Sequence, residues 1–388
     1  MNPSAELERD FDRFKRDLPR DFAAHVGAAY RVNLSARYLG EPIPHPIGKG
    51  SGQLSLNEAQ LRQDADAGLA FAVLKTVIAE DARGERSMAA WAVRESRMAV
   101  ERRRAASGRE GWTVTWKGRG WDRDLAAYLA LVRAGADLTR AGELLVVPSA
   151  KYHLPAAGEP FRESEYRHTT AALAAAWGRT PLPLEKDFSP TLAGDALARE
   201  REAVLRWLRE VPRLVRSAAP VRLAVKLMNA RFDDAFQVAM MCAAAGAGAD
   251  TLVCFNRLYD PARSVAFGGW DLSDRNLRVL DLYASGNTGT PGTPALTGTG
   301  NICSGRMILE YVRRGCESVE LHTFFQLPLG SYPATHGTRT QRALHALVFD
   351  PVEGLVAGLL DLETAGVLER RDGELHLLDV LPRTDRAD

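Results

Sequence analysis

The sequence predicts an α/β protein that folds as a closed (β/α)8 TIM barrel. Short apolar runs typical of buried strands alternate with helical patterns along most of the chain, and this alternation indicates βαβ units with parallel strands. Eight such runs can be counted, the number that closes a barrel. The glycine-rich turn follows the seventh run, whereas an open dinucleotide-binding sheet would carry it after the first strand.

The expected strands mostly leave room for a helix between one and the next. They lie near Pro46, Leu69–Thr76, Trp112–Trp116, Glu143–Val147, Val221–Lys226, Thr251–Phe255, Ala295–Thr299 and Ser318–Leu321. The helices expected between them include Leu125–Arg133, Asp233–Ala245, Asp274–Tyr283 and Ser304–Arg314. The barrel is therefore expected to span residues 30–342.

Three segments are additional to a minimal barrel. Residues 1–29 are charged and amphipathic, which predicts an N-terminal helical extension. Residues 155–219, before the sixth strand, are too long for a simple crossover; two helical patterns flank a Pro-rich turn at 181–190 and predict a helical insertion over the barrel mouth. Residues 343–388 combine a helical pattern with an Asp-Gly turn, which predicts a helix and β-hairpin appendage for packing or dimerisation.

Composition and charge exclude several classes of protein. Hydrophobic residues make up 46% of the chain, enough for a sizeable core, and 50 Lys and Arg against 49 Asp and Glu give a net charge of +1. This balance gives no reason to expect a nucleic acid or an anionic membrane as partner. No apolar run reaches the about 18 residues of a membrane span, and the charged N-terminus lacks the apolar segment of a signal peptide. We therefore expect a cytoplasmic protein.

The cysteines give no sign of a metal centre. The chain has four, at Cys242, Cys254, Cys303 and Cys316. They are widely spaced and form no CxxC pair, so neither a zinc or iron–sulfur site nor a disulfide framework is expected.

The strongest chemical signal is a pair of loops near the end of the barrel. The segment Leu296–Gly305 passes from a strand through a glycine turn into a helix, and Val319–Thr323 ends the next strand in a hydroxyl residue. In a barrel these two loops form the usual phosphate site, because bare backbone N–H groups at a helix N-terminus suit a dianion. The residues expected there are Gly300, Asn301, His322 and Thr323.

Four segments form an ordered set of small-residue turns, lysine-bearing strands and phosphate loops. They are His45–Gly52, Gly68–Thr76, Val221–Lys226 and the pair Leu296–Gly305 with Glu320–Thr323. Taken together they resemble the dihydroorotate dehydrogenase family of FMN-containing barrels, and the resemblance covers residues 30–335. It implies FMN as the cofactor of this chain.

The resemblance also implies roles for individual residues. The residues it assigns to FMN are Gly50, Ser51, Gly52, Lys75, Thr76, Lys226, Gly300, Asn301, His322 and Thr323, with Asn256 assigned to the substrate. The small residues would let the backbone pass close to the flavin, and the strand-end lysine Lys226 would stabilise its reduced, anionic form. The alternatives are a plain surface turn, salt-bridged strand-end lysines and an ordinary strand-end histidine.

The substrate side departs from the family. The strand that carries the family's catalytic base and two asparagines resembles Glu143–Lys151, where both asparagines are missing, and Arg86–Trp91 replaces an asparagine-rich loop. Each missing amide leaves a polar edge of orotate unpaired at a cost of about 1–3 kcal/mol. We therefore expect the same flavin and a substrate other than orotate.

The candidates for the catalytic acid or base are three residues of one loop: Ser149, Tyr152 and His153. Tyr or His could exchange a proton directly, whereas Ser would need a proton relay. In a further alternative the loop only shapes the pocket.

The expected function is that of an FMN-dependent oxidoreductase. It would oxidise or reduce a C–C or C=C bond next to a carbonyl in a small molecule of specialised metabolism, with hydride exchanged at flavin N5. One alternative is a phosphate-binding barrel lyase or isomerase in which Lys75 or Lys226 forms an imine. Another is a flavin-binding scaffold without turnover. The electron partner is left unidentified, and a homodimer is left open.

Overall fold

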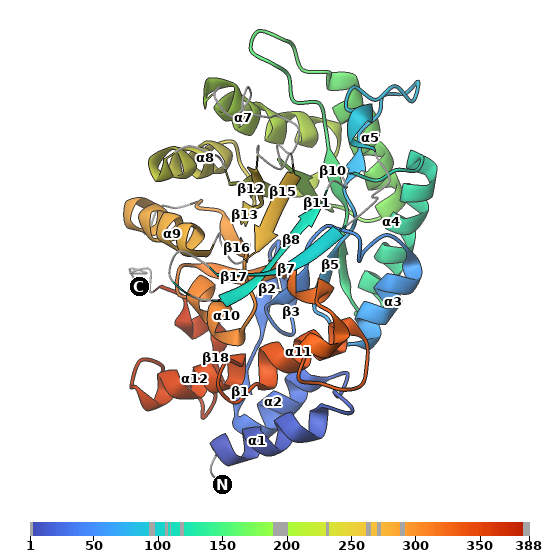
Figure 1. Ribbon diagram of the computed structural model, residues 1–388. Helices are drawn as coiled ribbons and strands as arrows, with labels where there is room; N and C mark the ends of the chain where they lie inside the picture. Colours follow the sequence, from blue (N-terminus) through green and yellow to red (C-terminus); the bar gives the residue numbers. More distant parts are fainter. Residues whose placement is uncertain are drawn as a thin grey trace.

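The computed structural model describes residues 3–92, 98–104, 108, 110–116, 120–188, 201–229, 233–260, 265–269, 273–287 and 292–382. Its largest feature is a curled parallel sheet (Figure 1) in the order β6-β10-β11-β12-β13-β16-β17-β4-β5-β9. The strands are β4 (Ile47–Lys49), β5 (Phe71–Val73), β6 (Val77–Ile78), β9 (Leu145–Val147), β10 (Ser149–Lys151), β11 (Leu182–Asp187), β12 (Val221–Met228), β13 (Thr251–Asn256), β16 (Ala295–Thr299) and β17 (Cys316–Leu321). The α/β class and the parallel pairing are therefore as predicted.

The predicted closed ring of eight strands is not confirmed, because the sheet has ten strands in the described part of the chain. The first and last strands in this order, β6 and β9, each belong to a stretch of chain in which a short break separates two strands. β9 and β10 are separated by Pro148 alone, and proline has no N–H to donate to a ladder. β5 and β6 are separated by residues 74–76. Backbone bonds continue past both breaks, since Leu74 N donates to Val147 O and Ala79 N donates to Lys151 O, each at 2.9 Å.

One expected strand belongs to a different sheet. The run Trp112–Trp116 lies in β8 (Glu110–Trp116), which pairs antiparallel with β7 (Met98–Arg104) and β15 (Val265–Gly269). With β14 (Leu258–Asp260) these form a four-stranded sheet, which lies in front of the main sheet in the view of Figure 1. The predicted place of Trp112–Trp116 in the barrel is therefore wrong.

The missing strand lies in the predicted insertion. β11 occupies most of the stretch expected as a Pro-rich turn and pairs with both β10 and β12. Every residue of β11 is buried. Its charged residues Glu185, Lys186 and Asp187 are not typical of a buried strand, so the sequence did not predict one here. Residues 155–219 thus contain a strand between α5 (Glu163–Trp177) and α7 (Arg201–Ala218), not only helices. Residues 189–200 of this predicted insertion lie outside the described part.

Helices cover the outer face of the curled sheet (Figure 1). Besides α5 and α7 they are α3 (Glu58–Asp66), α4 (Leu125–Arg140), α8 (Asp234–Gly246), α9 (Ser273–Asn287) and α10 (Gly305–Val312). Several begin at a side-chain cap: Asp124, Asp233 and Ser304 each accept a bond from a backbone N–H of the first turn. Such caps satisfy donors that a helix leaves free, and they fix where each loop at the mouth of the sheet ends.

The two ends of the chain pack together. α1 (Pro3–Phe14) contacts α11 (Arg339–Phe349) and α12 (Leu355–Thr364), and the rings of Phe14 and Phe349 meet edge-on at 5.0 Å. α2 (Phe22–Tyr30) leads to β1 (Val32–Asn33), which pairs in parallel with β18 (Leu375–His376). The expected Asp-Gly turn is present, with φ of 53° at Asp372 and 79° at Gly373. Residues 383–388 of the predicted appendage lie outside the described part.

Among the described helices, none combines the length and apolarity that crossing a membrane requires.

Candidate functional site

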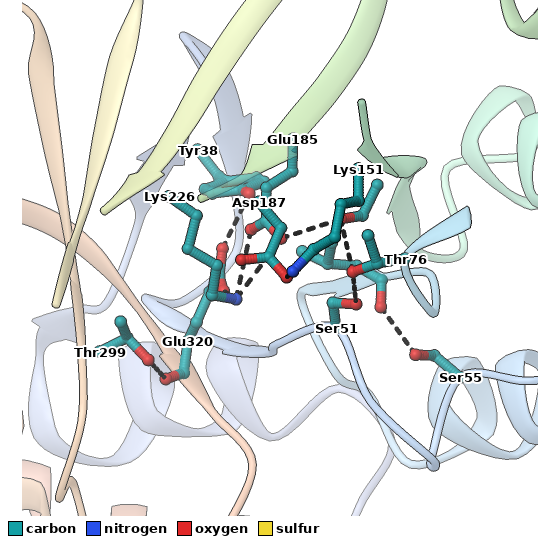
Figure 2. Close-up of polar contacts among 12 residues, drawn as sticks. Tyr38, Ser51, Ser55, Thr76, Lys151, Glu185, Asp187, Lys226, Thr299 and Glu320 are labelled. Atoms are coloured by element: carbon teal, nitrogen blue, oxygen red, sulfur yellow. Dashed lines mark hydrogen bonds and ion pairs between the residues drawn. The ribbon is translucent and has the colours of Figure 1, made fainter. Parts of the chain in front are cut away.

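Three buried ionisable side chains meet inside the curl of the sheet (Figure 2), and we call Glu185, Lys226 and Glu320 the acid–lysine cluster. Lys226 Nζ lies 2.6 Å from Glu320 Oε2 and 3.4 Å from each carboxylate oxygen of Glu185. All three residues are at most 4% exposed. The Tyr38 hydroxyl, from the hairpin of β2 (Ala36–Tyr38) and β3 (Glu41–Ile43), donates to Glu320 Oε1 at 2.9 Å.

The charges of this cluster do not balance, because one lysine faces two carboxylates. Burial alone would lower the pKa of Lys226, but Glu185 and Glu320 outweigh it and raise the pKa above its ordinary value. Burial, and then the charge of Glu320, raise the pKa of Glu185 well above its ordinary value. Since like charges in a low-dielectric site resist joint ionisation, the cluster favours the protonated form of Glu185.

A row of hydroxyl groups runs from the cluster to the turn after β4. Ser149 Oγ donates to Glu185 Oε1 at 3.2 Å and lies 3.0 Å from Thr76 Oγ1, which lies 2.8 Å from Ser51 Oγ. We call Ser51, Thr76 and Ser149 the hydroxyl chain. Thr76 and Ser149 are buried, while Ser51 is half-buried. Three predicted site residues are therefore brought into direct contact.

Further charged groups gather at the same end of the sheet. Lys151 Nζ lies 3.7 Å from Asp187 Oδ2 and 3.9 Å from the centre of the Trp91 ring. Burial, followed by the charge of Lys151, lowers the pKa of Lys186 to about 7. Burial, followed by the charges of Arg257, Lys75 and Lys226, lowers the pKa of His322 to about 3. His322 is therefore neutral at physiological pH, beside a concentration of positive charge.

The loop after β16 has the geometry expected of an anion cradle. Gly300 and Asn301 both have positive φ, 95° and 62°, and Asn is the non-glycine residue best able to adopt this conformation. Asn301 is 6% exposed, and among the described residues neither Nδ2 nor Oδ1 of its side chain has a hydrogen-bond partner. A buried amide without a partner costs free energy, so this loop has a polar group ready for a ligand. Ser304 then caps α10 by accepting from Met307 N at 3.2 Å.

Side chains behind the loop fix its position. Tyr311 Oη donates to Gly300 O at 2.7 Å, and Asn276 Nδ2 donates to Thr299 O at 3.0 Å. A Cβ atom at position 300 would lie 2.7 Å from Asn276 Nδ2 and 2.8 Å from Phe255 O. Glycine is therefore required at position 300 both for its φ and for the space behind it.

The glycines of the turn after β4 also approach the site. A Cβ at Gly50 would lie 3.1 Å from Glu320 Oε2 and 3.5 Å from Lys226 Nζ, and a Cβ at Gly52 would lie 2.0 Å from His322 Nε2. This turn therefore lies directly against the acid–lysine cluster and the end of β17. Thr323 follows β17 and starts a short 3₁₀ turn.

The three candidate acid–base residues do not lie together. Ser149 faces the interior, whereas Tyr152 stacks on Tyr166 at 4.6 Å and shares a 2.7 Å hydrogen bond with Thr170 of α5. The alternation of a strand accounts for this, since residues at odd spacing face opposite sides. The structure thus places Tyr152 in the layer between sheet and helix.

His153 and Asn256 lie outside the hydroxyl chain as well. His153 Nε2 is 3.2 Å from Glu159 Oε1, and burial lowers the pKa of His153. Asn256, at the end of β13, is half-buried, and its carbonyl accepts from Asn229 N and Nδ2, both at 3.0 Å. Whether Asn256 binds a substrate stays a prediction.

Sequence reasoning missed the acidic members of the site. Glu185 and Asp187 alternate along β11, as Ser318 and Glu320 do along β17. Residues two apart in a strand share one face, and this spacing of polar residues could have marked these four as lining the interior. Asn276 and Tyr311 lie on helices and carry no comparable signal.

No model of a known protein family matches this chain, and no curated protein matches it. Within the described residues, no group of three or more His, Cys, Asp or Glu side chains has the arrangement of a metal site.

Proposed function

We propose that this chain is an FMN-dependent oxidoreductase similar to dihydroorotate dehydrogenases, acting on a small molecule other than orotate. The observation that carries the proposal is the Gly300–Asn301 turn in the loop that leads to α10, where the buried Asn301 amide has no hydrogen-bond partner among the described residues. In the same proposal the ten-stranded sheet corresponds to a (β/α)8 barrel, with β5–β6 and β9–β10 counted as two interrupted strands.

The residues present fit a flavin mononucleotide. Its phosphate would be held by the backbone of Gly300, Asn301 and Thr323, with the Asn301 amide as an additional partner. Two of the cations that depress the pKa of His322, Arg257 and Lys75, would give the positive potential that a dianion needs. The flavin supplies a centre that accepts or gives a hydride.

The turn after β4 supports the placement of the flavin ring. Gly50 and Gly52 have no room for side chains, because a Cβ at either would meet the interior polar groups or His322. Glycine lets a backbone approach a bound ring closely. The same turn carries Ser51, whose hydroxyl starts the hydroxyl chain.

The state of Lys226 argues against the imine alternative for that residue. An imine-forming lysine must lose its proton to become a nucleophile. Glu185 and Glu320 do the opposite, since they raise the pKa of Lys226 despite its burial. Lys226 is therefore better suited to hold a fixed positive charge, shared with two carboxylates.

The side chains around the acid–lysine cluster support a substrate that differs from a pyrimidine. The groups near the mouth are ionic and aromatic, namely Lys151, Asp187 and Trp91. Of the three acid–base candidates, Ser149 is the one that the sheet directs inward, where its hydroxyl would relay a proton between Thr76 and Glu185. A carbonyl-bearing substrate whose neighbouring C–C bond is oxidised, or whose C=C bond is reduced, fits this set.

The test is to purify the full chain and to titrate it with FMN in the absence of oxygen. The proposal predicts a yellow protein whose absorbance near about 450 nm is lost on reduction. Candidate enones and saturated carbonyl compounds are then screened for oxidation or reduction of the bound flavin. A colourless chain that binds no added FMN would refute the proposal, and a loaded chain that no substrate or reductant turns over would favour the scaffold alternative.

A further inference from the structure

We propose that Glu185 is a buried proton reservoir, which exchanges a proton with the molecule bound at the mouth through Ser149, Thr76 and Ser51. This inference deepens the function proposed above and rests on it, because the proton exchanged is the one that accompanies hydride transfer. Glu185 acts through the hydroxyl chain and touches no substrate itself.

The geometry provides a continuous path. Successive oxygen–oxygen distances are 2.8 Å from Ser51 to Thr76, 3.0 Å from Thr76 to Ser149 and 3.2 Å from Ser149 to Glu185. Each hydroxyl both donates and accepts, so the whole row can reverse its direction by rotation of three O–H bonds. The path starts at half-buried Ser51 and ends at Glu185, which is fully buried. A proton can therefore pass between the mouth and the interior without entry of bulk water.

The surroundings of Glu185 make both of its protonation states tolerable. The ionisable groups that face it are Lys226 of β12, Glu320 of β17, Asp187 of its own strand, Tyr38 of β2 and Tyr128 of α4. As a neutral acid Glu185 avoids repulsion from Glu320. As a carboxylate it has the ammonium group of Lys226 at 3.4 Å.

Glu320 is held by partners other than the hydroxyl chain. It lies closer to Lys226, at 2.6 Å, and accepts a further bond from Tyr38 at 2.9 Å. Glu185 instead accepts from Ser149 at 3.2 Å. The two acidic residues therefore have different tasks: Glu320 binds Lys226 and Tyr38, and Glu185 ends the hydroxyl chain.

The transfers balance in both directions. When a C=C bond is reduced, hydride adds to one carbon and leaves negative charge on the other carbon and its carbonyl. Ser51 gives its hydroxyl proton to that carbon, Thr76 reprotonates Ser51, Ser149 reprotonates Thr76, and Glu185 reprotonates Ser149 and becomes a carboxylate. When the C–C bond is oxidised, the same protons move the other way and Glu185 ends as the neutral acid.

The first test follows the proton on Glu185 by infrared spectroscopy of the full chain moved from H2O into D2O. We expect a carboxyl C=O stretching band that is absent in Glu185→Gln and that shifts as the proton exchanges for deuterium. Thr76→Val should slow that shift, because the isosteric valine interrupts the hydroxyl chain. Thr297→Val is the matched control: its hydroxyl is buried in the same sheet, but it is bonded to Ser318 at 3.0 Å.

The outcomes of this test are distinct. A missing band, a band that survives in Glu185→Gln, or equal exchange rates in Thr76→Val and Thr297→Val would overturn the inference. If Glu185→Gln does not fold, the comparison of the two valine variants still decides it. No flavin is needed, so a failure of FMN to bind would refute the proposed function without being mistaken for a failure of the relay.

The second test uses the FMN-loaded protein. Per bound flavin, Ser149→Ala and Glu185→Gln should each lose about 100-fold in turnover, a typical contribution of positioned acid–base groups. The pH dependence of turnover in the wild type should flatten in Glu185→Gln, a change that a purely structural role of Glu185 would not produce. Unchanged turnover and an unchanged pH profile in these variants would overturn the inference.

Discussion

Lys226 and Glu320 form an ion pair of 2.6 Å although β12 and β17 are three places apart in the sheet order. Strands lie about 4.8 Å apart, so a flat sheet would separate these two by about 14 Å. The contact is therefore made across the interior of the curl. Together with Glu185 it ties three strands to one buried charge centre, on which both the stability of the sheet and the chemistry proposed for its mouth depend.

Removal of the lysine should destabilise the fold as well as the site. Lys226→Met leaves the buried side chains of Glu320 and Glu185 without their cation, and breaking a buried ion pair costs about 3–5 kcal/mol. Urea unfolding at pH 7 should show this loss of free energy of unfolding, with partial recovery at lower pH as the carboxylates take up protons. The triple variant Lys226→Met, Glu185→Gln, Glu320→Gln should restore much of the stability. A single Lys226→Met variant as stable as the wild type would contradict the role assigned to this cluster.

Glu185 should make the protein less stable as pH rises. Its pKa in the folded chain lies well above the ordinary value of 4.5, so above that pH the unfolded state gives up a proton that the folded state retains. The free energy of unfolding therefore falls with rising pH until Glu185 itself ionises in the folded state. Glu185→Gln removes this dependence, so its stability relative to the wild type should increase between pH 5 and pH 8.

The control for this pH effect is Glu202→Gln, because the Glu202 side chain is 84% exposed. Urea unfolding of both variants at the two pH values gives the comparison. If the difference between Glu185→Gln and the wild type is the same at pH 5 and pH 8, Glu185 does not retain its proton in the folded protein.

Tyr152 should be dispensable for turnover. Its hydroxyl shares a hydrogen bond with Thr170 in the layer between sheet and helix, so Tyr152→Phe should cost about 1 kcal/mol of stability for one buried bond. Flavin content and turnover per flavin should match the wild type, in contrast to Ser149→Ala. A large loss of turnover in a fully loaded Tyr152→Phe variant would return this residue to the list of acid–base candidates.

Asn301 should be more important for the ligand than for the fold. Asn301→Gly keeps a residue that accepts positive φ and removes two buried polar atoms that have no partner. The ligand-free variant should therefore melt no lower than the wild type by calorimetry. A hydrogen bond to a charged group contributes about 1.5–3 kcal/mol, so FMN should bind at least about tenfold more weakly by titration. A drop in ligand-free stability with unchanged FMN affinity would show that Asn301 is a structural residue.

The sequence predicted those features of the structure that depend on residues adjacent in the chain. The glycine turn at Gly300 and the helix starts at Asp233 and Ser304 are written in a few adjacent residues, and each lies where it was expected or within a residue of it. β11 was not predicted because its acidic residues form ion pairs with residues distant in the sequence; Glu185, for example, pairs with Lys226. The same long-range pairing explains why Glu185 and Glu320 could not be predicted as partners.

The division of inward and outward residues shows a second limit. Ser149 and Tyr152 are three residues apart in one predicted loop, and the sequence alone could not say which faces the site. The break at Pro148 and the start of β10 at Ser149 set that direction. Once the bounds of β10 are known, the alternation of side chains along the strand shows that Ser149, and not Tyr152, faces the site.

Gly300 allows a test of the anion cradle with a matched control. Gly300→Ala adds a Cβ that would lie 2.7 Å from Asn276 Nδ2 and 2.8 Å from Phe255 O, whereas Gly142→Ala adds one with no heavy atom within 4 Å. Both glycines have positive φ, 95° and 69°, so each alanine also adds backbone strain, of about 1–2 kcal/mol at position 142 and more at position 300, where φ lies outside the left-handed region. FMN titration should show weakened binding only for Gly300→Ala, because only there must the loop move away from Asn276. Equal FMN affinity in both variants would mean that the phosphate is not bound by this turn.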